Sequence, residues 1–339
     1  MYNSRSMIHC GEGASMNFGD LAGNETLKRQ LSAAVDNGHF PHALLLEGEE
    51  GTGRRTVARL VARAATCRGE GQRPCGRCAA CMKSEHPDVT VYDVYGKQKV
   101  VDAMRDLRQQ AHLLPNEAPH RVFIIENAQL MLPAAQNALL KTLEEPPRHV
   151  LFILLCENRT QLLETIRSRC TLLTLQPVTW DEAAPVLQRR LQTVDVEELQ
   201  RAHSLFGGRI GRVIDGVQEG TFRQVLELTP AMAKALVAVG EMPLMTLTAS
   251  LEKDKELTAA VLRGLTLVLR DALACRYGAT GRLSTAPEEA SLLAQKLTGT
   301  RLMALMKTVD DLQQDLLHNM NNTLFLTRLS ARLRQAAMG

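Results

Sequence analysis

The sequence predicts an α/β protein in which a parallel-sheet module with a phosphate-loop-type turn precedes two helical domains. Three observations support this prediction. Short, wholly apolar runs alternate with segments of helical spacing up to about residue 178, a glycine-rich turn follows the first of these runs, and beyond residue 220 only helical spacing remains. Wholly apolar strands separated by helices are typical of a parallel sheet that is covered on both faces.

The expected elements of the α/β part follow one another in a regular order. Residues 1–15 are polar and lack periodicity, which predicts a flexible tail. The spacing of Leu27, Leu31 and Val35 predicts a helix over residues 24–37. The further predicted elements are strands over 43–46, 122–125, 150–155 and 172–175, and a helix over 134–143 that Pro146 and Pro147 would end.

Changes in this pattern predict the domain boundaries. We expect the sheet module over residues 16–178, with a cysteine-rich insertion at about 67–81. Residues 179–220 predict short helices that are broken at Gly207-Gly208 and at Gly211. Residues 221–339 predict an all-helical domain, with apolar residues at intervals of three and four.

Composition excludes several classes of function. No apolar run approaches the roughly 20 residues that span a bilayer, so we expect no membrane association through a spanning helix. The first residues lack an apolar segment of signal-peptide length, so a cytoplasmic protein is expected. Lys and Arg number 40 against 37 Asp and Glu, and this net charge of +3 excludes a purely electrostatic coat for nucleic acid. Aromatic residues at 4% argue against stacking platforms for single strands.

Half of the eight cysteines lie close together, at Cys67, Cys75, Cys78 and Cys81. Thiols of a cytoplasmic protein stay reduced, and four thiolates at such short spacings can converge on one tetrahedral ion. The sequence therefore predicts a structural zinc site without an open coordination position. An iron–sulfur cluster of the bacterial ferredoxin type would need a fourth Cys followed by Pro, whereas Met82 follows here. Four unrelated buried cysteines are the remaining alternative.

A glycine-rich turn follows the first predicted strand and precedes a helical segment, which is the context of a phosphate-binding loop. Such a loop needs Lys at position 54 and Ser or Thr at position 55, and arginines stand at both. Thr56 lies about 100° further round the helix. These departures make ATP binding doubtful and leave an ordinary turn as the alternative. The candidate nucleotide-contacting residues are Gly48, Gly51, Gly53, Arg54, Arg55 and Thr56.

The strand over residues 122–125 ends in Glu126 and Asn127. An ATPase would carry Asp at the first position, to hold the metal, and Glu at the second, to orient the attacking water. A neutral amide cannot act as a base, so a second part of the hydrolytic machinery is altered together with the loop.

Two further segments carry a resemblance to a known family. Residues 137–147, with the sequence NALLKTLEEPP, and the triplet Ser168-Arg169-Cys170 resemble motifs of the bacterial DNA polymerase III clamp-loader subunits, which belong to the AAA+ class. The segment from Phe18 to Asn24 and the four-cysteine insertion also match. The resemblance covers about residues 16–215.

The resemblance implies a three-part architecture: an AAA+ module, a helical lid over 179–220 and a helical collar for oligomerisation over 221–339. Active subunits of the gamma/tau type have Lys-Thr in the loop and Asp-Glu on the second strand. Loss of these residues together with retention of Ser168-Arg169-Cys170 is typical of the delta-prime type, a stator without ATPase activity of its own. Arg169 would then be an arginine finger that acts on a neighbouring subunit.

The partners implied are the gamma/tau motor subunits, the delta subunit, the sliding clamp indirectly and primer–template DNA, within the DNA polymerase III holoenzyme. A γ-phosphate-sensing arginine would fall near Gly211, where Arg209 or Arg212 could replace it. Two alternatives remain open. One is an active gamma/tau-type ATPase that tolerates the changes, and the other is a zinc-dependent nucleic-acid-binding module outside replication.

Overall fold

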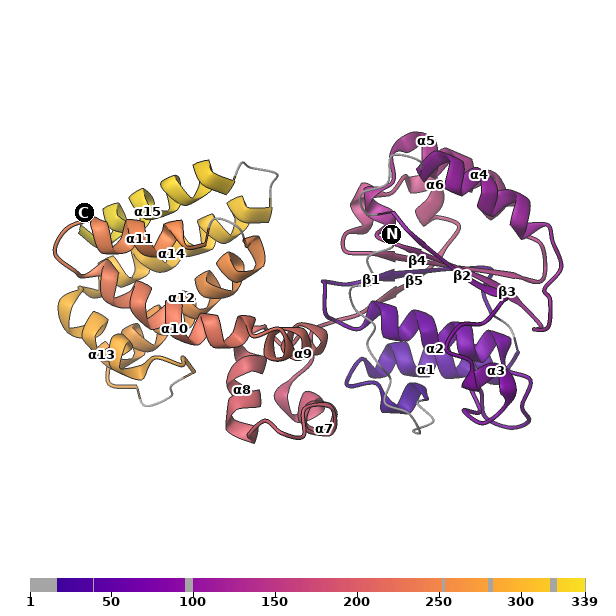
Figure 1. The fold of residues 1–339 in the computed structure, drawn as a ribbon, viewed down its shortest axis with the longest axis horizontal. Helices are drawn as coiled ribbons and strands as arrows, with labels where there is room; N and C mark the ends of the chain where they lie inside the picture. The colour runs from indigo at the N-terminus through magenta and orange to yellow at the C-terminus, as the bar shows by residue number, and fades with distance from the viewer. Residues whose placement is uncertain are drawn as a thin grey trace. The chain divides into compact units, whose positions relative to one another are not determined.

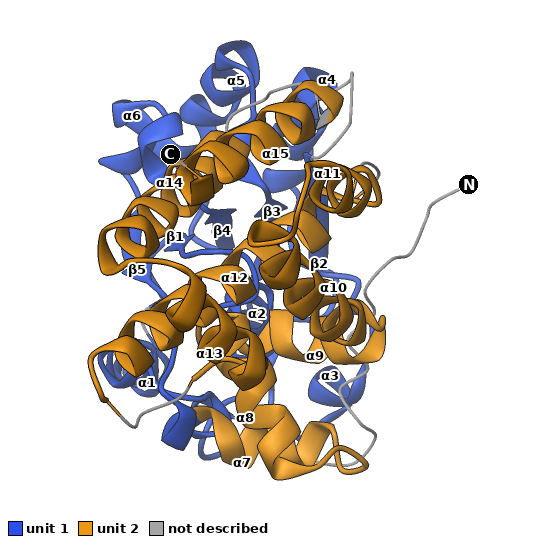
Figure 2. Cartoon of the chain, turned by 90° about the vertical axis from the view of Figure 1, so that its left-hand side faces the viewer, with its two compact units in different colours: residues 1–182 blue, residues 183–339 orange. Residues whose placement is uncertain are grey.

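The computed structural model describes residues 17–38, 40–94, 100–251, 254–279, 283–317 and 322–338. The tail predicted over residues 1–15 lies outside the described residues. The chain divides into two compact units, residues 1–182 and residues 183–339 (Figure 2). The first contains the sheet, and the second contains helices throughout its described part.

The first unit is built on a five-stranded parallel sheet with the strand order β2-β3-β4-β1-β5. Leu45 at the centre of β1 pairs with Leu154 of β4 on one side and Leu172 of β5 on the other. The four strands predicted from sequence are confirmed, and β2 was missed because its side chains are only partly buried and include polar residues. The strands are β1 (Ala43–Glu47), β2 (Val89–Asp93), β3 (Arg121–Glu126), β4 (Val150–Cys156) and β5 (Thr171–Thr174).

Helices cover both faces of this sheet (Figure 1). One face carries α1 (Glu25–Asp36), α2 (Arg54–Thr66) and α3 (Ala79–Met82), and the other carries α4 (Val100–Ala111), α5 (Pro133–Glu144) and α6 (Glu164–Arg167). Helices α1 and α5 confirm the helices predicted over residues 24–37 and 134–143, and α2 confirms the helical segment predicted after the glycine-rich turn. Three short 3-10 helices complete the unit: η1 (Phe18–Asp20), η2 (Ala128–Leu130) and η3 (Arg159–Gln161).

Alternation along the central strands produces two cores. Leu44 and Leu46 of β1 pack with the α1–α2 side, whereas Leu45 packs with the α4–α5 side. Successive side chains of a strand point to opposite faces, so a wholly apolar strand is what a doubly covered sheet requires. Since all strands are parallel, their carboxyl ends lie at one edge of the sheet, and Glu47, Glu126 and Cys156 end their strands there.

The described part of the second unit is helical. The breaks at Gly207 and Gly208, both with positive φ, are confirmed, but the break predicted at Gly211 is wrong. Gly211 lies in the first turn of α9, where one isolated glycine is tolerated. The lid–collar boundary near residue 220 stays a prediction. The helices are α7 (Trp180–Arg190, which begins in the first unit), α8 (Val196–Leu205), α9 (Ile210–Gln218), α10 (Thr221–Leu236), α11 (Met242–Ala249), α12 (Lys255–Arg276), α13 (Pro287–Lys296), α14 (Gly299–Leu317) and α15 (Asn322–Met338).

Hydrophobic spacing explains the longest of these helices. In α12 the residues Leu257, Val261, Leu265 and Val268 recur at intervals of three and four, and all are buried. Asp254 caps the helix, because its carboxylate accepts hydrogen bonds from the N–H groups of residues 256 and 257. Among the described residues, no helix combines the length and the apolar character that crossing a membrane requires.

Candidate functional sites

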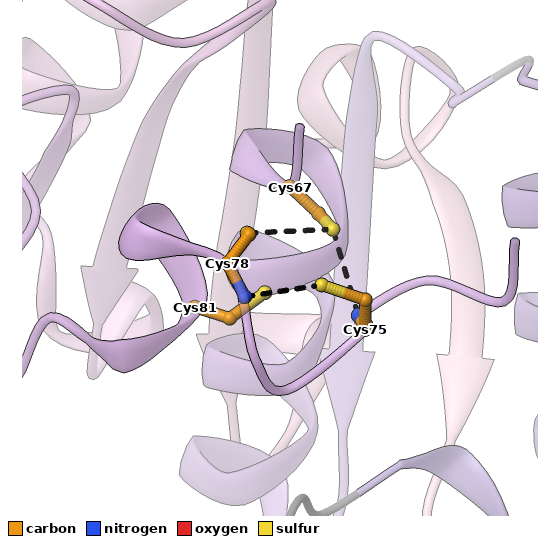
Figure 3. A group of neighbouring side chains, drawn as sticks. All are labelled: Cys67, Cys75, Cys78 and Cys81. Atoms are coloured by element: carbon orange, nitrogen blue, oxygen red, sulfur yellow. Dashed lines mark hydrogen bonds between the residues drawn. The ribbon is translucent and has the colours of Figure 1, made fainter. Parts of the chain in front are cut away.

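The four clustered cysteines converge at the end of α2 that is remote from the glycine-rich loop (Figure 3). Cys67 immediately follows α2, Cys75 and Cys78 lie in the connecting loop, and Cys81 is on α3. Their four sulfur atoms all lie within 4.8 Å of one another. The Sγ atoms of Cys67 and Cys78 are 3.9 Å apart. The structure thus brings together all four residues that the sequence predicted as metal ligands.

The loop backbone holds the sulfur atoms in this arrangement. The N–H of Cys75 donates to Cys67 Sγ at 3.5 Å, and the N–H of Cys78 donates to Cys75 Sγ at 3.4 Å. Gly76 between them adopts φ +67°, a left-handed conformation that side chains disfavour. Sulfur atoms that accept backbone N–H groups are stabilised as thiolates, the form that binds metals.

The acidities of the thiols agree with this arrangement. A hydrogen bond from the backbone of Arg77 lowers the pKa of Cys75. Burial opposes ionisation of Cys78, but hydrogen bonds from backbone and neighbouring thiols outweigh it and lower its pKa to about 6. Burial raises the pKa of Cys81. These opposite shifts allow Cys78 to be ionised while Cys81 stays protonated.

These residues fit a tetrahedral zinc ion. Four thiolates at the roughly 2.3 Å Zn–S distance place sulfur atoms about 3.8 Å apart, close to the separation of Cys67 and Cys78. Zinc held by Cys67, Cys75, Cys78 and Cys81 would cross-link α2, the loop and α3. Four protein ligands leave no position for water or substrate, so such an ion supplies stability and no chemistry.

The glycine-rich loop joins β1 to α2. Gly51 and Gly53 have φ values of +86° and +99°. A Cβ at Gly48 would lie 2.8 Å from the carbonyl oxygen of Leu175, so no side chain fits there. The loop therefore keeps the backbone conformation for which glycine is needed, although the residues that follow are changed.

Each of the two arginines at the start of α2 has a carboxylate partner. Arg54 is buried, and its Nη2 donates to Glu157 Oε1 at 3.2 Å, beyond the end of β4. Its Nη1 is buried without a hydrogen-bond partner. Arg55 Nε donates to Glu126 Oε2 at 2.9 Å, at the end of β3. The structure thus joins two of the predicted nucleotide-contacting positions, 55 and 126, in one ion pair. Thr56 lies one position further into α2.

Asn127 points away from this pair. It adopts a left-handed conformation with φ +55°, and its Nδ2 donates to Asp93 Oδ1 at 3.0 Å, at the end of β2. The Asn127 amide thus bonds to the end of the neighbouring strand β2 and not to Glu126 or Arg55.

Sequence reasoning missed three charged residues at this edge: Glu47, Glu157 and Arg159. Glu47 accepts a hydrogen bond from the N–H of Arg159 at 3.0 Å, and the Arg159 guanidinium lies 3.8 Å from its carboxylate. Their positions at or just after the ends of apolar strands were the available signal, because carboxyl ends of parallel strands meet at one edge.

Arg169 lies beyond α6, among the helices on the α4–α5 face. Its Nη2 is 2.8 Å from Glu144 Oε1, at the end of α5, and its Nη1 donates to the carbonyl of Thr165 at 2.9 Å. About 35% of its side chain is exposed. The neighbouring Cys170 is a packed residue, and burial raises the pKa of its thiol to about 12. Glu144 is part of the NALLKTLEEPP segment, so the two motifs that carried the resemblance touch each other.

The candidate sensor arginines lie in the second unit. Arg209 precedes α9, and its Nε donates to the carbonyl of Phe206 at 2.9 Å. Arg212 makes two contacts of 2.6 Å with the carboxylate of Glu256. Both side chains are thus held by residues of their own unit.

A five-stranded parallel sheet of this order, with a glycine-rich loop between β1 and α2 and an all-helical second unit, defines an AAA+ module followed by a helical collar. Comparison with known proteins agrees. The family model described as DNA polymerase III, delta subunit, matches residues 23–179, and the model of the C-terminal part of that subunit matches residues 229–335. The chain belongs to the family of DNA polymerase III clamp-loader subunits.

Individual relatives come from the same family. DNA polymerase III subunit gamma of Buchnera aphidicola is 28% identical over 63% of this chain and 57% of its own length. DNA polymerase III subunit tau of Escherichia coli is 30% identical over 71% of this chain and 37% of its own length. The chain thus spans little more than half of the one and about a third of the other. A solved gamma subunit-related protein of Thermotoga maritima has a TM-score of 0.45 at 17% identity, covering 92% of this chain and 99% of its own.

Proposed function

We propose that this chain is a delta-prime-type subunit of a DNA polymerase III clamp loader: a stator that does not hydrolyse ATP and offers Arg169 to an ATPase site on a neighbouring subunit. The observation that carries the proposal is the Arg55–Glu126 ion pair. It joins the two positions from which an active subunit would hold the metal of its nucleotide.

The changes at the loop argue against hydrolysis by this chain. Phosphoryl transfer needs a hydroxyl at position 55 and an acid at position 126 on the metal, and a residue at position 127 that orients water. Arg55 offers no oxygen, Glu126 is paired with it, and Asn127 donates to Asp93. Two parts of the reaction, holding the metal and orienting the attacking water, would therefore have no residue to carry them out.

Arg169 has the properties of a residue that acts on a partner. A guanidinium is always charged, and its planar fork can bridge two phosphate oxygens. The Arg169 side chain is partly exposed, and Glu144 orients it from one side. An arginine supplied in trans stabilises the negative charge that spreads over the γ-phosphoryl oxygens in the transition state.

The proposed partners are the gamma/tau motor subunits and the delta subunit, with the sliding clamp reached indirectly and primer–template DNA held by the assembly. The helical second unit would be the collar through which subunits associate. The proposed structural zinc would stabilise the insertion between α2 and β2, and it takes no part in ATP hydrolysis.

Reconstitution of the loader tests the proposal. The chain alone is expected to show no multiple-turnover ATPase activity, whereas its addition to the motor and delta subunits raises the DNA- and clamp-stimulated ATPase rate. Arg169→Ala is expected to abolish that increase, while Arg148→Ala, which removes an exposed arginine of the same unit, leaves it intact. Size-exclusion chromatography must show that the variant still assembles. An unchanged ATPase rate with an assembled Arg169→Ala subunit would rule out the finger.

A gamma/tau-type ATPase is the second candidate, because the relatives named above are gamma and tau subunits. It predicts magnesium-dependent turnover by the isolated chain, and loss of that turnover in Arg54→Ala. A steady-state ATPase assay of the wild-type chain separates the two candidates directly.

A further inference from the structure

The family implies a magnesium ion beside the nucleotide, and the residues at positions 55 and 126 do not fit one. Magnesium demands near-octahedral coordination by oxygen atoms. Arg55 supplies a cation where a hydroxyl oxygen is needed, and its Nε lies 2.9 Å from the Glu126 carboxylate. A second cation on that carboxylate would have to displace the guanidinium or share its partner with it.

We propose that the Arg55–Glu126 ion pair is an internal replacement for the magnesium ion, so that the loop keeps its conformation with neither metal nor nucleotide. The guanidinium supplies the positive charge that the ion would supply to the end of β3. This inference deepens the proposed stator function and rests on it only for its biological meaning, because the ion pair itself is a property of this chain alone.

The burial of Glu126 strengthens the argument. Its side chain is 15% exposed, whereas that of Arg55 is 42% exposed. A carboxylate that leaves water needs a charged or hydrogen-bonded partner. Arg55 meets that need from within the chain, and Asn127 does not compete because its amide donates to Asp93.

The other arginine of the loop repeats the arrangement. Arg54 stands where a lysine would contact phosphate, and the Glu157 carboxylate lies 3.2 Å from its Nη2. Glu47 has Arg159 as its counterpart. Three carboxylates at or just after strand ends, Glu126, Glu157 and Glu47, are thus each matched by one arginine, so these three need no bound cation to balance them. Arg54 Nη1 is buried without a hydrogen-bond partner, so it is a donor that a phosphate oxygen could use without metal.

Thermal unfolding of the full chain tests the inference. The midpoint would be measured with ATP, ADP or inorganic pyrophosphate, with magnesium and without it. The magnesium-free buffer contains no chelator besides these anions, so that zinc bound by the four cysteines is not stripped from them. Magnesium is expected to change the wild-type midpoint by less than about 1 °C with each anion, since a saturating ligand shifts a domain of this size by about 5 °C. A magnesium-dependent rise of that size in the wild type would overturn the inference.

Two sets of variants make the test specific. The triple substitution Arg54→Lys, Arg55→Thr and Glu126→Asp restores the pattern of active subunits and is expected to gain a magnesium-dependent shift with ADP. A folded triple variant that stays indifferent to magnesium contradicts the inference. If the triple variant does not fold, the ion pair is tested by the single variants Arg55→Thr and Glu126→Gln and by their combination. Each single change should lower the midpoint by about 1–3 °C, with little further loss in the double variant. Additive losses mean that the pair is not formed, and a failure of Arg169 in the reconstituted loader leaves this result untouched.

Discussion

Helix α2 has a candidate ligand site at each end, and the two are built in opposite ways. At its carboxyl end, Cys67 joins three other cysteines whose sulfur atoms lie within 4.8 Å of one another. At its amino end, Arg54 and Arg55 each have a carboxylate partner from another part of the chain. The cysteine cluster groups side chains of one chemistry around a common centre, whereas the loop balances its own charges.

The two sites show that a loop can have the backbone conformation of a ligand site without the side chains that would bind the ligand. The loop retains glycines with positive φ at positions 51 and 53, so its path is still that of a phosphate-binding turn. Arginines stand at positions 54 and 55, and each is paired with a carboxylate. In the cysteine cluster both features are present, since Gly76 has a positive φ and the four thiols are candidate metal ligands. Substitutions at each end of α2 can therefore test whether the cysteine cluster binds metal and whether the loop depends on its backbone conformation.

The largest effect is expected at the cysteine cluster. Cys78→Ser should abolish stoichiometric zinc binding and expose the segment between α2 and β2 to proteases. Structural zinc contributes roughly 10–16 kcal/mol to small zinc-dependent peptides, and only part of that would be lost here, because the sheet has cores of its own. Metal analysis by mass spectrometry and limited proteolysis measure the two consequences.

Cys275→Ser is the matched control, because Cys275 is exposed in the second unit and far along the chain from the cluster. It should leave zinc content and the protease pattern unchanged. Full zinc content in Cys78→Ser, or loss of zinc from the control, would contradict a site made of the four clustered cysteines.

A buried carboxylate just before β2 stabilises the end of the segment between α2 and β2 without metal. Asp88 is fully buried and accepts hydrogen bonds from the N–H groups of residues 116, 117 and 118 and from the side chain of Asn116, at 2.6–3.1 Å. Asp88→Asn should lower the free energy of unfolding by about 1–3 kcal/mol, because an amide nitrogen cannot accept the bonds that it would then face. Urea titration followed by circular dichroism measures the loss, and zinc content should stay at the wild-type value.

Acid should weaken this stabilisation in two steps of the same sign. Burial opposes ionisation of Asp88, but the backbone N–H groups outweigh it and lower its pKa. Burial lowers the pKa of the neighbouring His86. In both cases the unfolded chain binds the proton more readily, so stability is full above the unfolded pKa values, about 6.5 and 3.9, and falls as pH drops below each. Asp88→Asn should reduce the lower step, to which Asp271 also contributes because its pKa is lowered as well, and a wild-type stability that rises on acidification would refute this account.

A substitution that changes the backbone conformation of the glycine-rich loop should destabilise the protein. Gly48→Ala would place a Cβ 2.8 Å from the Leu175 carbonyl and 2.7 Å from the Thr52 hydroxyl, and it should cost about 1–3 kcal/mol. Combining it with Thr52→Ala relieves only the second conflict. If the backbone is the obstacle, the urea midpoint of the double variant stays low, relative to Thr52→Ala alone, whereas full recovery assigns the cost to the hydroxyl.

The sequence predicted the cysteine cluster better than it predicted the ion pairs at the glycine-rich loop. Cysteine spacing was sufficient for the cluster because its ligands lie within one short segment, and apolar runs were sufficient for four strands. The Arg55–Glu126 and Arg54–Glu157 pairs join residues 71 and 103 positions apart, and no local pattern encodes such distances. The half-exposed strand β2 and helix α4 were missed, whereas Gly211 was given too much weight as a helix breaker.

Thiol alkylation is expected to have the smallest effect on the fold. It compares the reactivity of a cysteine in the cluster with that of a cysteine near the glycine-rich loop. After zinc removal, Cys78 should react with iodoacetamide much faster than Cys156 and Cys170 near pH 7, because its pKa of about 6 makes it mainly thiolate. Cys156, at the loop end of β4, and Cys170 have pKa values that burial raises to about 12, so only about one thiol in 10⁵ is ionised at that pH. Peptide mass spectrometry against reaction time should show Cys78 protected in the zinc-loaded chain and modified in the stripped chain, with Cys156 unmodified in both. Equal rates at Cys78 and Cys156 would mean that the hydrogen bonds around Cys78 do not lower its pKa. The cluster would then have the geometry of a metal site without thiols that ionise readily.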